Sequence, residues 1–237
     1  MAMLWLPHSL APTPDLGDTL VWIVRDADAP PEWVTDPDAL NEAEKSRAAN
    51  LRHPLAHSQF VRGRAILRSA LALWLNVAPR KVPIQLTPDG KPYLDAADVH
   101  FNISHTAGFA LFGIGRRPIG VDIERANPQR DCDGLVKRYF TPPEQEQYFL
   151  MPESRRPAAF LRGWTCKEAL LKAIGSGVRD LQNCRLNLNP DEAPTILAAP
   201  GEGFWELKTG EVELGVAWAV ATAFQAGVKR NCQSLPS

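Results

Sequence analysis

A chain of 237 residues can form one large domain or two small ones, and either can bury a dry hydrophobic core. Its composition of 45% hydrophobic and 22% charged residues argues against a disordered chain or a coiled coil. The 26 basic and 27 acidic residues give a net charge of −1, so no chain-wide positive field recruits nucleic acid.

No membrane span or export signal is predicted. The longest apolar stretch, from Val216 to Phe224, is far shorter than the roughly 18 residues of a spanning helix. The N-terminus lacks the basic start and long apolar run of a signal peptide. The cysteines form no C-x-x-C pair and have no His at zinc-ligand spacing, so we expect free thiols in a cytoplasmic protein. They are Cys132, Cys166, Cys184 and Cys232.

The first 35 residues are rich in proline and contain one expected strand, Leu20 to Val24. Asp36-Pro37-Asp38 is typical of a helix start, because Asp caps the helix and Pro suits its first turn, and this helix should run to Asn50. A second helix is expected after Pro54 and should end before Pro79. Its apolar stripe at helical spacing is Phe60, Leu67, Leu71 and Trp74.

Beyond Pro79 the apolar residues repeat at every second position, which predicts strands. In the strand expected over residues 99–104, Phe101 and Ile103 form an apolar face, whereas Asn102 and Ser104 form a polar one. The expected strands are residues 82–86, 91–93 after a turn at 87–90, 99–104, 109–115 and 119–123.

The second part of the chain returns to helices and then to strands. Helices are expected over residues 135–139, 143–150 and 158–174, with Gly175 and Gly177 as the stop. Strands are expected over residues 184–188, 204–207 and 211–222. The order of helices and then strands thus occurs twice, with the repeat point near Arg116, and it suggests two similar halves.

Two carboxylates lie two residues apart in the expected strand at Ile119 to Glu124. Asp122 and Glu124 share one face, while Val121 and Ile123 face the core. Paired hard oxygens facing a cleft are what Mg²⁺ or Mn²⁺ requires. A solvated acidic face on an edge strand explains the same spacing equally well.

In the last expected helix Trp164, Glu168 and Lys172 lie on one face. Glu168 and Lys172 fit a surface ion pair, which is the commoner meaning of this spacing, but a Trp on the same face favours a buried functional surface.

A third segment, Asn102 to His105, ends a strand before a Gly-containing turn, and such a strand end can bind phosphate. Ser104 and His105 are not a hydrolase pair, because neighbours on a strand point to opposite sides. Several basic side chains add to these groups, and Arg64 is unusual because it falls on the apolar stripe. The basic residues are Lys45, Arg47, Arg52, Arg62, Arg64, Arg68 and Lys91.

Five segments, Asp89–Tyr93, Phe101–His105, Gly120–Glu124, Tyr139–Glu144 and Trp164–Lys172, stand in one order along the chain. In this order and approximate spacing they resemble the 4′-phosphopantetheinyl transferase superfamily, specifically its larger surfactin-synthetase-activating (Sfp) type. Each motif alone is moderately specific, whereas the five together are highly specific.

The resemblance implies an α/β (α+β) fold of two similar halves related by a pseudo-twofold axis. Residues 1–116 would form the N-terminal half on the coenzyme A (CoA) side, and residues 117–237 the C-terminal half with the metal and catalytic groups. The implied reaction transfers the 4′-phosphopantetheine arm of CoA to a serine of an apo acyl or peptidyl carrier protein. It releases adenosine 3′,5′-bisphosphate and depends on Mg²⁺.

The resemblance also implies roles for single residues. Asp122, Glu124 and Glu168 become ligands of Mg²⁺, or of Mn²⁺ in its place. Glu168, or a water on the metal, becomes the base, and Asp122, Glu168 and Lys172 are the expected catalytic residues. The expected contacts to the CoA phosphates are Lys91, Ser104, His105 and Lys172. The residues matched to the 3′-phosphate and adenine side are Lys45, Arg47, Arg52 and Arg64.

Two alternatives stay open. One is another Mg²⁺-dependent transferase that uses CoA or a nucleotide on the same scaffold. The other is a non-catalytic module that binds carrier proteins, and the intact Asp122, Glu124 and Glu168 argue against it. The expected protein is a monomer whose partners are CoA and an apo carrier protein, with no nucleic acid and no membrane. The sequence does not distinguish a fatty-acid, polyketide or nonribosomal-peptide carrier.

Overall fold

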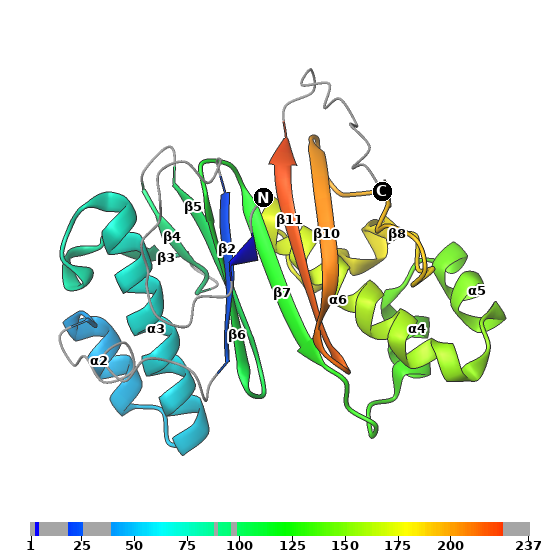
Figure 1. The fold of residues 1–237 in the computed structure, drawn as a ribbon, viewed down its shortest axis with the longest axis horizontal. Coiled ribbons are helices and arrows are strands. Elements are labelled where there is room, and N and C mark those ends of the chain that lie inside the picture. The colour runs from blue at the N-terminus through cyan, green and yellow to red at the C-terminus, as the bar shows by residue number, and fades with distance from the viewer. Residues whose placement is uncertain (1–2, 5–18, 26–38, 88–89, 96–98, 225–237) are drawn as a thin grey trace, which may run out of the picture.

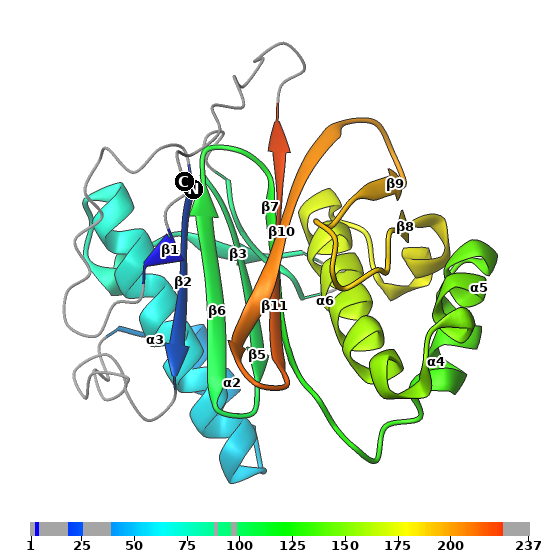
Figure 2. The same ribbon diagram turned by 45° about the vertical axis from the view of Figure 1, so that its right-hand side comes forward.

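The computed structural model describes residues 3–4, 19–25, 39–87, 90–95 and 99–224. Two antiparallel-rich sheets pack against each other in the middle of the molecule, and helices lie on both outer sides (Figures 1 and 2). The fold is therefore the expected mixture of helices and strands.

The first sheet has the strand order β1-β2-β6-β5. Its strands are β1 (Met3–Leu4), β2 (Thr19–Arg25), β5 (His100–Thr106) and β6 (Phe109–Gly115). Two helices, α2 (Glu42–Ala49) and α3 (Pro54–Leu75), lie on one side of it. A turn of 3₁₀ helix, η2 (Pro79–Lys81), then leads into the hairpin of β3 (Ile84–Leu86) and β4 (Pro92–Leu94).

The second sheet has the order β10-β11-β7. Its strands are β7 (Ile119–Arg125), β10 (Phe204–Glu213) and β11 (Val216–Phe224). The helices α4 (Cys132–Tyr139), α5 (Pro142–Leu150) and α6 (Arg156–Ile174) follow β7, with the 3₁₀ turns η3 (Glu153–Arg155) and η4 (Val178–Asn183). The hairpin of β8 (Arg185–Leu186) and β9 (Ile196–Ala198) precedes β10.

The same order of elements occurs in both parts of the chain. A strand comes first, then helices, then a small hairpin, and finally a long hairpin whose last strand pairs with the first strand. The orders β2-β6-β5 and β7-β11-β10 correspond strand for strand. The repeat thus begins with a strand, not with a helix as the sequence suggested.

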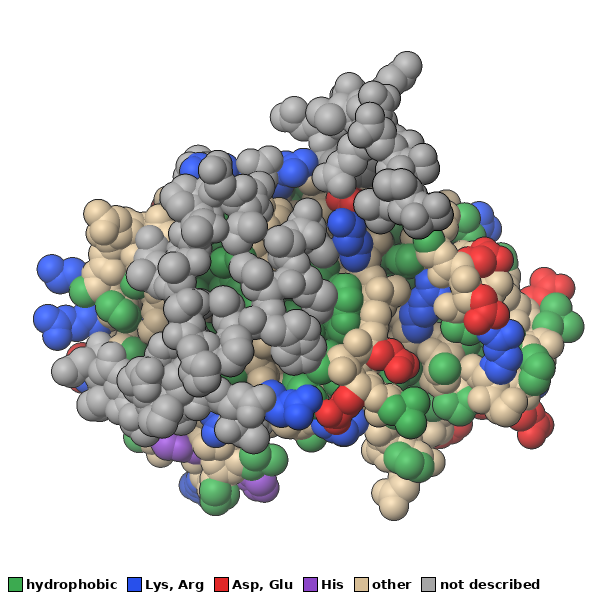
Figure 3. All heavy atoms as spheres, in the orientation of Figure 1, with side chains coloured by type: hydrophobic (Ala, Val, Ile, Leu, Met, Phe, Trp, Pro, Cys, Tyr) green, Lys and Arg blue, Asp and Glu red, His purple; other side chains and the backbone are tan. Residues whose placement is uncertain are grey.

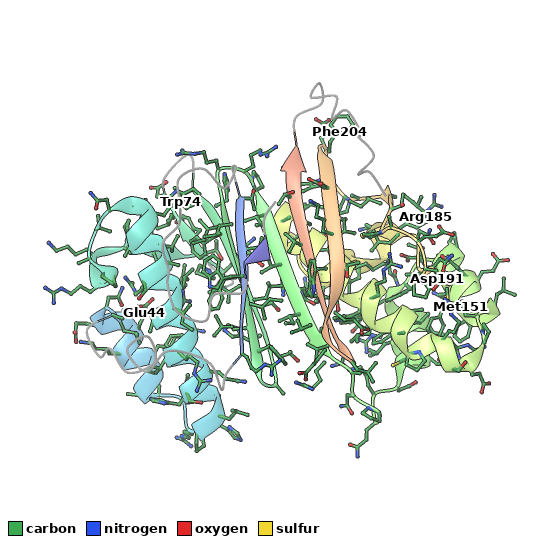
Figure 4. All side chains as sticks on the ribbon, viewed as in Figure 1. Glu44, Trp74, Met151, Arg185, Asp191 and Phe204 are labelled. Carbon is green, nitrogen blue, oxygen red and sulfur yellow. The ribbon has the colours of Figure 1, made fainter. Side chains whose placement is uncertain are left out.

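Three layers of buried side chains hold this arrangement together. The first joins α3 to the first sheet and includes Trp22, stacked on Phe112, with Trp74 partly buried at its margin (Figure 4). The second lies between the sheets and contains Val121 and Ile123, as the strand pattern predicted. The third joins α6 to β10 and β11. Burial of apolar surface in these layers is the main stabilising contribution to the fold.

The structure differs from the expected elements most clearly at helix α2 and at residues 211–222. The described helix α2 begins at Glu42, where Asn41 and Glu44 form a capping box, and the expected start at Asp36 lies outside the described residues. The strand expected over residues 211–222 is two strands, because Gly215 adopts a φ of 76° and turns the chain. Gly175, with a φ of 86°, ends α6 as predicted.

The described residues bear on three further expectations. Cys132, Cys166 and Cys184 are free thiols, and Cys232 lies outside the described part. Within the described chain, no helix has the length and apolar character to span a membrane. Lys and Arg side chains lie among Asp and Glu side chains over the C-terminal half of the face shown in Figure 3, which agrees with the near-neutral net charge.

Candidate active site

The site is built where helix α6 crosses strand β7. A Cβ atom on Gly120 would lie 2.0 Å from the carbonyl oxygen of Ala169 and 2.3 Å from the backbone nitrogen of Ala173. Only glycine therefore lets the helix approach this closely. Gly120, Asp122 and Glu124 share one face of β7, so the close approach sets Glu168 and Lys172 of α6 over the two carboxylates.

Asp122 is the centre of a small hydrogen-bonded group. Its Oδ1 atom accepts from Lys172 Nζ at 2.6 Å and from Ser104 Oγ at 2.7 Å, and Lys172 Nζ lies 3.2 Å from Ser104 Oγ. Asp122 is only 3% exposed, which rules out a solvated acidic face. Lys172 thus binds Asp122 instead of forming a surface pair with Glu168.

The polar face of β5 supplies Ser104 to this group. Asn102 Oδ1 accepts from the backbone N–H of Val121 at 2.9 Å, and Thr106 Oγ1 accepts from that of Arg125 at 3.0 Å. Alternate side chains of β5 therefore hydrogen-bond to β7 across the contact between the two sheets. The face that the sequence marked as polar is buried at this seam and not in solvent.

Glu124 and Glu168 lie in the same electrostatic neighbourhood as Asp122. Burial raises the pKa of Glu168 above its ordinary value; the Lys172 ammonium lowers it, and the charges of Asp122 and Glu124 raise it further. Burial and the charge of Asp122 also raise the pKa of Glu124, against the opposing effect of Arg130, whose Nη2 lies 3.4 Å from Glu124 Oε2. Three carboxylates thus influence one another, and the cations that act on the two glutamates are Lys172 and Arg130.

This donor set fits a hard divalent cation. Asp122 Oδ2 is buried and has no hydrogen-bond partner among the described residues, so one carboxylate oxygen is available as a ligand. As the side chains stand, no three Asp, Glu, His or Cys residues of the described chain are close enough together to hold a metal ion. The cation that contacts Asp122 in this structure is the Lys172 ammonium.

Lys91 reaches the same place from the N-terminal part of the chain. Its Nζ donates to the backbone carbonyl of Lys172 at 2.7 Å, in the last turn of α6. A cavity of about 360 Å³ lies between the two sheets at this point, lined among others by Lys91, Tyr93, His100 and Lys172. Two lysines that are 81 residues apart in the chain therefore line one opening.

Ser104 and His105 point to opposite sides of β5. Ser104 faces Asp122, whereas the imidazole of His105 lies against α3, where a Cβ on Gly63 would be 2.7 Å from Nε2. His105 also meets the ring of Phe112 edge-on at 6.3 Å. The hydroxyl and the imidazole do not form a nucleophile pair.

Two arginines of α2 and α3 gather around the side chain of Phe60. The guanidinium groups of Arg47 and Arg64 lie over the ring of Phe60, at 5.2 and 5.6 Å from its centroid. Arg64 is 8% exposed, its Nε lies 3.8 Å from Glu44 Oε1, and burial lowers its pKa. Its Nη1 is buried and has no hydrogen-bond partner in the described part of the chain, so it is a donor available to an anion.

Not every predicted basic residue is placed to bind a ligand. Lys45 forms an ion pair with Glu42 at 3.0 Å on the surface of α2, and Arg52 is exposed between α2 and α3. Arg68 is fully buried and structural, because its guanidinium donates to Glu44 at 2.5 Å and to two backbone carbonyls of the chain after α3.

Sequence reasoning missed several partners in and around the site. Glu44, labelled in Figure 4, holds the arginines, and only its place in an N-x-x-E capping box signals that it is special. No sequence pattern marked Arg130 as a partner of Glu124. In the two late motifs, Glu144 and Lys167 form a fully buried ion pair at 2.7 Å, so these motif residues hold α5 against α6.

Comparison with known proteins shows the family to which the chain belongs. Residues 118–223 match the family model of the 4′-phosphopantetheinyl transferase superfamily. One curated relative is 34% identical over 209 residues, which are 86% of this chain and 88% of that protein. The chain therefore belongs to the 4′-phosphopantetheinyl transferase superfamily.

That relative is the 4′-phosphopantetheinyl transferase HetI of Nostoc sp. (strain PCC 7120). The 4′-phosphopantetheinyl transferase Sfp of Bacillus subtilis (strain 168) is 27% identical over 163 residues, covering 68% of this chain and 72% of Sfp. The predicted superfamily and its Sfp-like type are thus confirmed. A solved holo-(acyl-carrier-protein) synthase from Bacillus anthracis str. Ames, in complex with CoA (3′,5′-ADP), matches with 22% identity and a TM-score of 0.39. The match covers 45% of this chain and 94% of the synthase chain.

Proposed function

We propose that this chain transfers the 4′-phosphopantetheine arm of CoA to a serine of an apo carrier protein and releases adenosine 3′,5′-bisphosphate. The observation that carries the proposal is the Ser104–Asp122–Lys172 group beside Glu124 and Glu168, where the two sheets meet. Relatives named as 4′-phosphopantetheinyl transferases, over most of the chain's length, support it.

Asp122, Glu124 and Glu168 are the residues that would hold Mg²⁺, or Mn²⁺ in its place. When bound, such a cation supplies positive charge to a pyrophosphate during its cleavage. The orphaned Oδ2 of Asp122 and the electrostatic repulsion among the three carboxylates support this assignment.

The remaining chemistry belongs to side chains of the chain itself. The serine hydroxyl of the carrier attacks the phosphorus that bears the pantetheine arm, and Glu168 accepts the hydroxyl proton. A carboxyl whose pKa is raised is a better proton acceptor than an ordinary one. Lys172, Lys91 and Ser104 donate hydrogen bonds to the phosphate oxygens on which negative charge grows as the bond to the departing bisphosphate breaks. His105 lies on the opposite side of β5, against α3, and is our candidate contact for another phosphate of CoA.

The arginine group on α2 and α3 is our candidate for the 3′-phosphate and adenine end of CoA. Arg64 offers a buried unpaired donor, and Arg47 shares the Phe60 ring with it. Lys45 is paired with Glu42 and Arg52 is exposed, and our proposal places both at the margin of this subsite.

The test is mass spectrometry of apo carrier proteins incubated with CoA, Mg²⁺ and this protein. We expect a carrier to gain the mass of one phosphopantetheine arm, and a carrier with its acceptor serine changed to alanine to gain nothing. If no member of a panel of fatty-acid, polyketide and peptide-synthetase carriers is modified, the proposal is wrong.

Four further statements remain predictions. They are the division into halves at residues 1–116 and 117–237, the monomeric state, the cytoplasmic location, and the pathway whose carrier is served. The repeated element order on either side of residues 116–118 supports the first of them.

A further inference from the structure

We propose that Lys172 acts as a built-in counter-cation that keeps divalent metal binding weak until CoA is present. In the ligand-free protein its ammonium occupies Asp122, and a phosphate ligand draws it away. This inference rests on the proposed function, because it concerns the residues assigned there to the metal and to CoA.

The contacts of Asp122 place the ammonium in competition with a metal ion. Asp122 Oδ1 already accepts from Lys172 Nζ at 2.6 Å and from Ser104 Oγ at 2.7 Å. A divalent cation on the same carboxylate would lie close to the ammonium, and like charges beside a buried carboxylate repel each other. Asp122 is 3% exposed, so little water is present to screen that repulsion.

The surrounding charges explain why the chain keeps a lysine there. Besides burial, the charge of Asp122 raises the pKa of both Glu124 and Glu168, and the charge of Glu124 raises that of Glu168. The Lys172 ammonium lowers the pKa of both glutamates, and Arg130 lowers that of Glu124. If Arg130 alone offset the three carboxylates, their mutual repulsion would destabilise the contact between α6 and β7. Lys172 supplies a second cation while no metal is bound.

The Lys172 side chain also has room to turn away from Asp122. Its side chain is 29% exposed, compared with 5% for the side chain of Asp122. Its backbone carbonyl is held by Lys91 Nζ at 2.7 Å, so α6 stays in place while the side chain turns. The cavity of about 360 Å³ that Lys91 and Lys172 both line can receive an anionic group next to the ammonium.

The consequence is a coupling between two ligands. A phosphate in the cavity gives the Lys172 ammonium a second partner and leaves Asp122 to the metal. By thermodynamic linkage, the metal then strengthens CoA binding by the same factor. Metal and CoA are thus expected to load together.

The experiment is a titration of the full chain with Mn²⁺, with free Mn²⁺ followed by electron paramagnetic resonance. Without CoA, Lys172→Met should bind Mn²⁺ about tenfold more tightly than the wild type, within the roughly 5–150-fold range of coupled sites. Lys172→Gln should behave in the same way. Lys172→Arg, which keeps a cation on Asp122, should stay near the wild type.

Lys91→Met is the matched control, because it removes one positive charge at the same cavity from a side chain that donates to a carbonyl oxygen. If Lys172→Met and Lys172→Gln bind Mn²⁺ no more tightly than Lys91→Met does, the inference is wrong. It is also wrong if the wild type binds Mn²⁺ as tightly without CoA as with it, a measurement that needs no variant. Carrier modification is read separately by mass spectrometry, so a failed transferase assay with intact coupling refutes only the proposed function.

Discussion

Replacing Gly120 by alanine tests whether the close crossing of α6 and β7 builds the site. The added Cβ would lie 2.0 Å from the carbonyl oxygen of Ala169 and 2.3 Å from the nitrogen of Ala173. Both are backbone atoms of a helix, so neither can rotate away, and α6 must move outward by about 1.4 Å to restore ordinary contact distances.

The cost can be estimated from this geometry. Overpacking of a well-packed contact costs about 1–3 kcal/mol, and the upper value applies when backbone atoms are in the way. For a chain of this size each kcal/mol lowers the melting temperature by about 2–4 °C, so we expect a decrease of roughly 6–12 °C. A displacement of about 1.4 Å between Glu168 and the β7 carboxylates should reduce transfer by about 10²-fold or more.

Differential scanning calorimetry and the carrier modification assay read the two effects. Gly177→Ala is the control, because Gly177 has open space at its Cβ position and a φ of −104°, which alanine adopts without strain. Its melting temperature and activity should match the wild type. A Gly120→Ala protein with wild-type stability and turnover would show that the crossing does not position the catalytic groups.

Four other changes test single residues. Asp122→Ala should abolish transfer at any Mg²⁺ concentration, and normal turnover in dilute Mg²⁺ would remove Asp122 from the metal site. Glu168→Gln should lower turnover by about 10²-fold or more at saturating substrates, since it removes the proton acceptor. Because burial raises the pKa of Glu168 above its ordinary value of 4.5, ionisation destabilises the metal-free fold. The free energy of unfolding of Glu168→Gln should therefore increase relative to the wild type as the pH rises from about 4.5 through the raised pKa, and a pH-independent difference contradicts the assignment. Arg64→Gln should weaken binding of CoA more than binding of 3′-dephospho-CoA in calorimetric titrations, and equal losses would give Arg64 another role. Lys167→Met should cost about 3–5 kcal/mol of stability by leaving the Glu144 carboxylate buried and unpaired, and adding Glu144→Gln should recover part of that loss in urea unfolding.

Local sequence patterns were enough to predict the elements that carry the site. A continuous apolar run predicted β6 at Phe109–Gly115, all of whose residues are buried. The apolar residues at every second position from Ile119 predicted the start of β7. The same period put Asp122 and Glu124 on one face and Val121 and Ile123 in the core. The motif order predicted the superfamily.

Local patterns were weaker where one apolar period continues through a turn. Residues 211–222 alternate without interruption, yet Gly215 turns the chain and makes two strands of them. The short strand β9 and the 3₁₀ turn η4 carry too few residues to show any period. The boundary at Gly215 is set by the pairing of β10 with β11, and the bounds of β9 are set by its pairing with β8.

The sequence by itself determined the composition of the site: which side chains carry charge, and which share a strand or helix face. Only the tertiary structure decided which of them meet. Lys172 and Asp122 are 50 residues apart, Arg68 and Glu44 are 24 apart, and Lys167 and Glu144 are 23 apart. Each pair joins two different elements, and the distance between its charges is set by how closely those elements pack. At α6 and β7 that packing depends on the missing Cβ of Gly120, which is why Lys172 contacts Asp122 and not the glutamate one turn before it on its own helix.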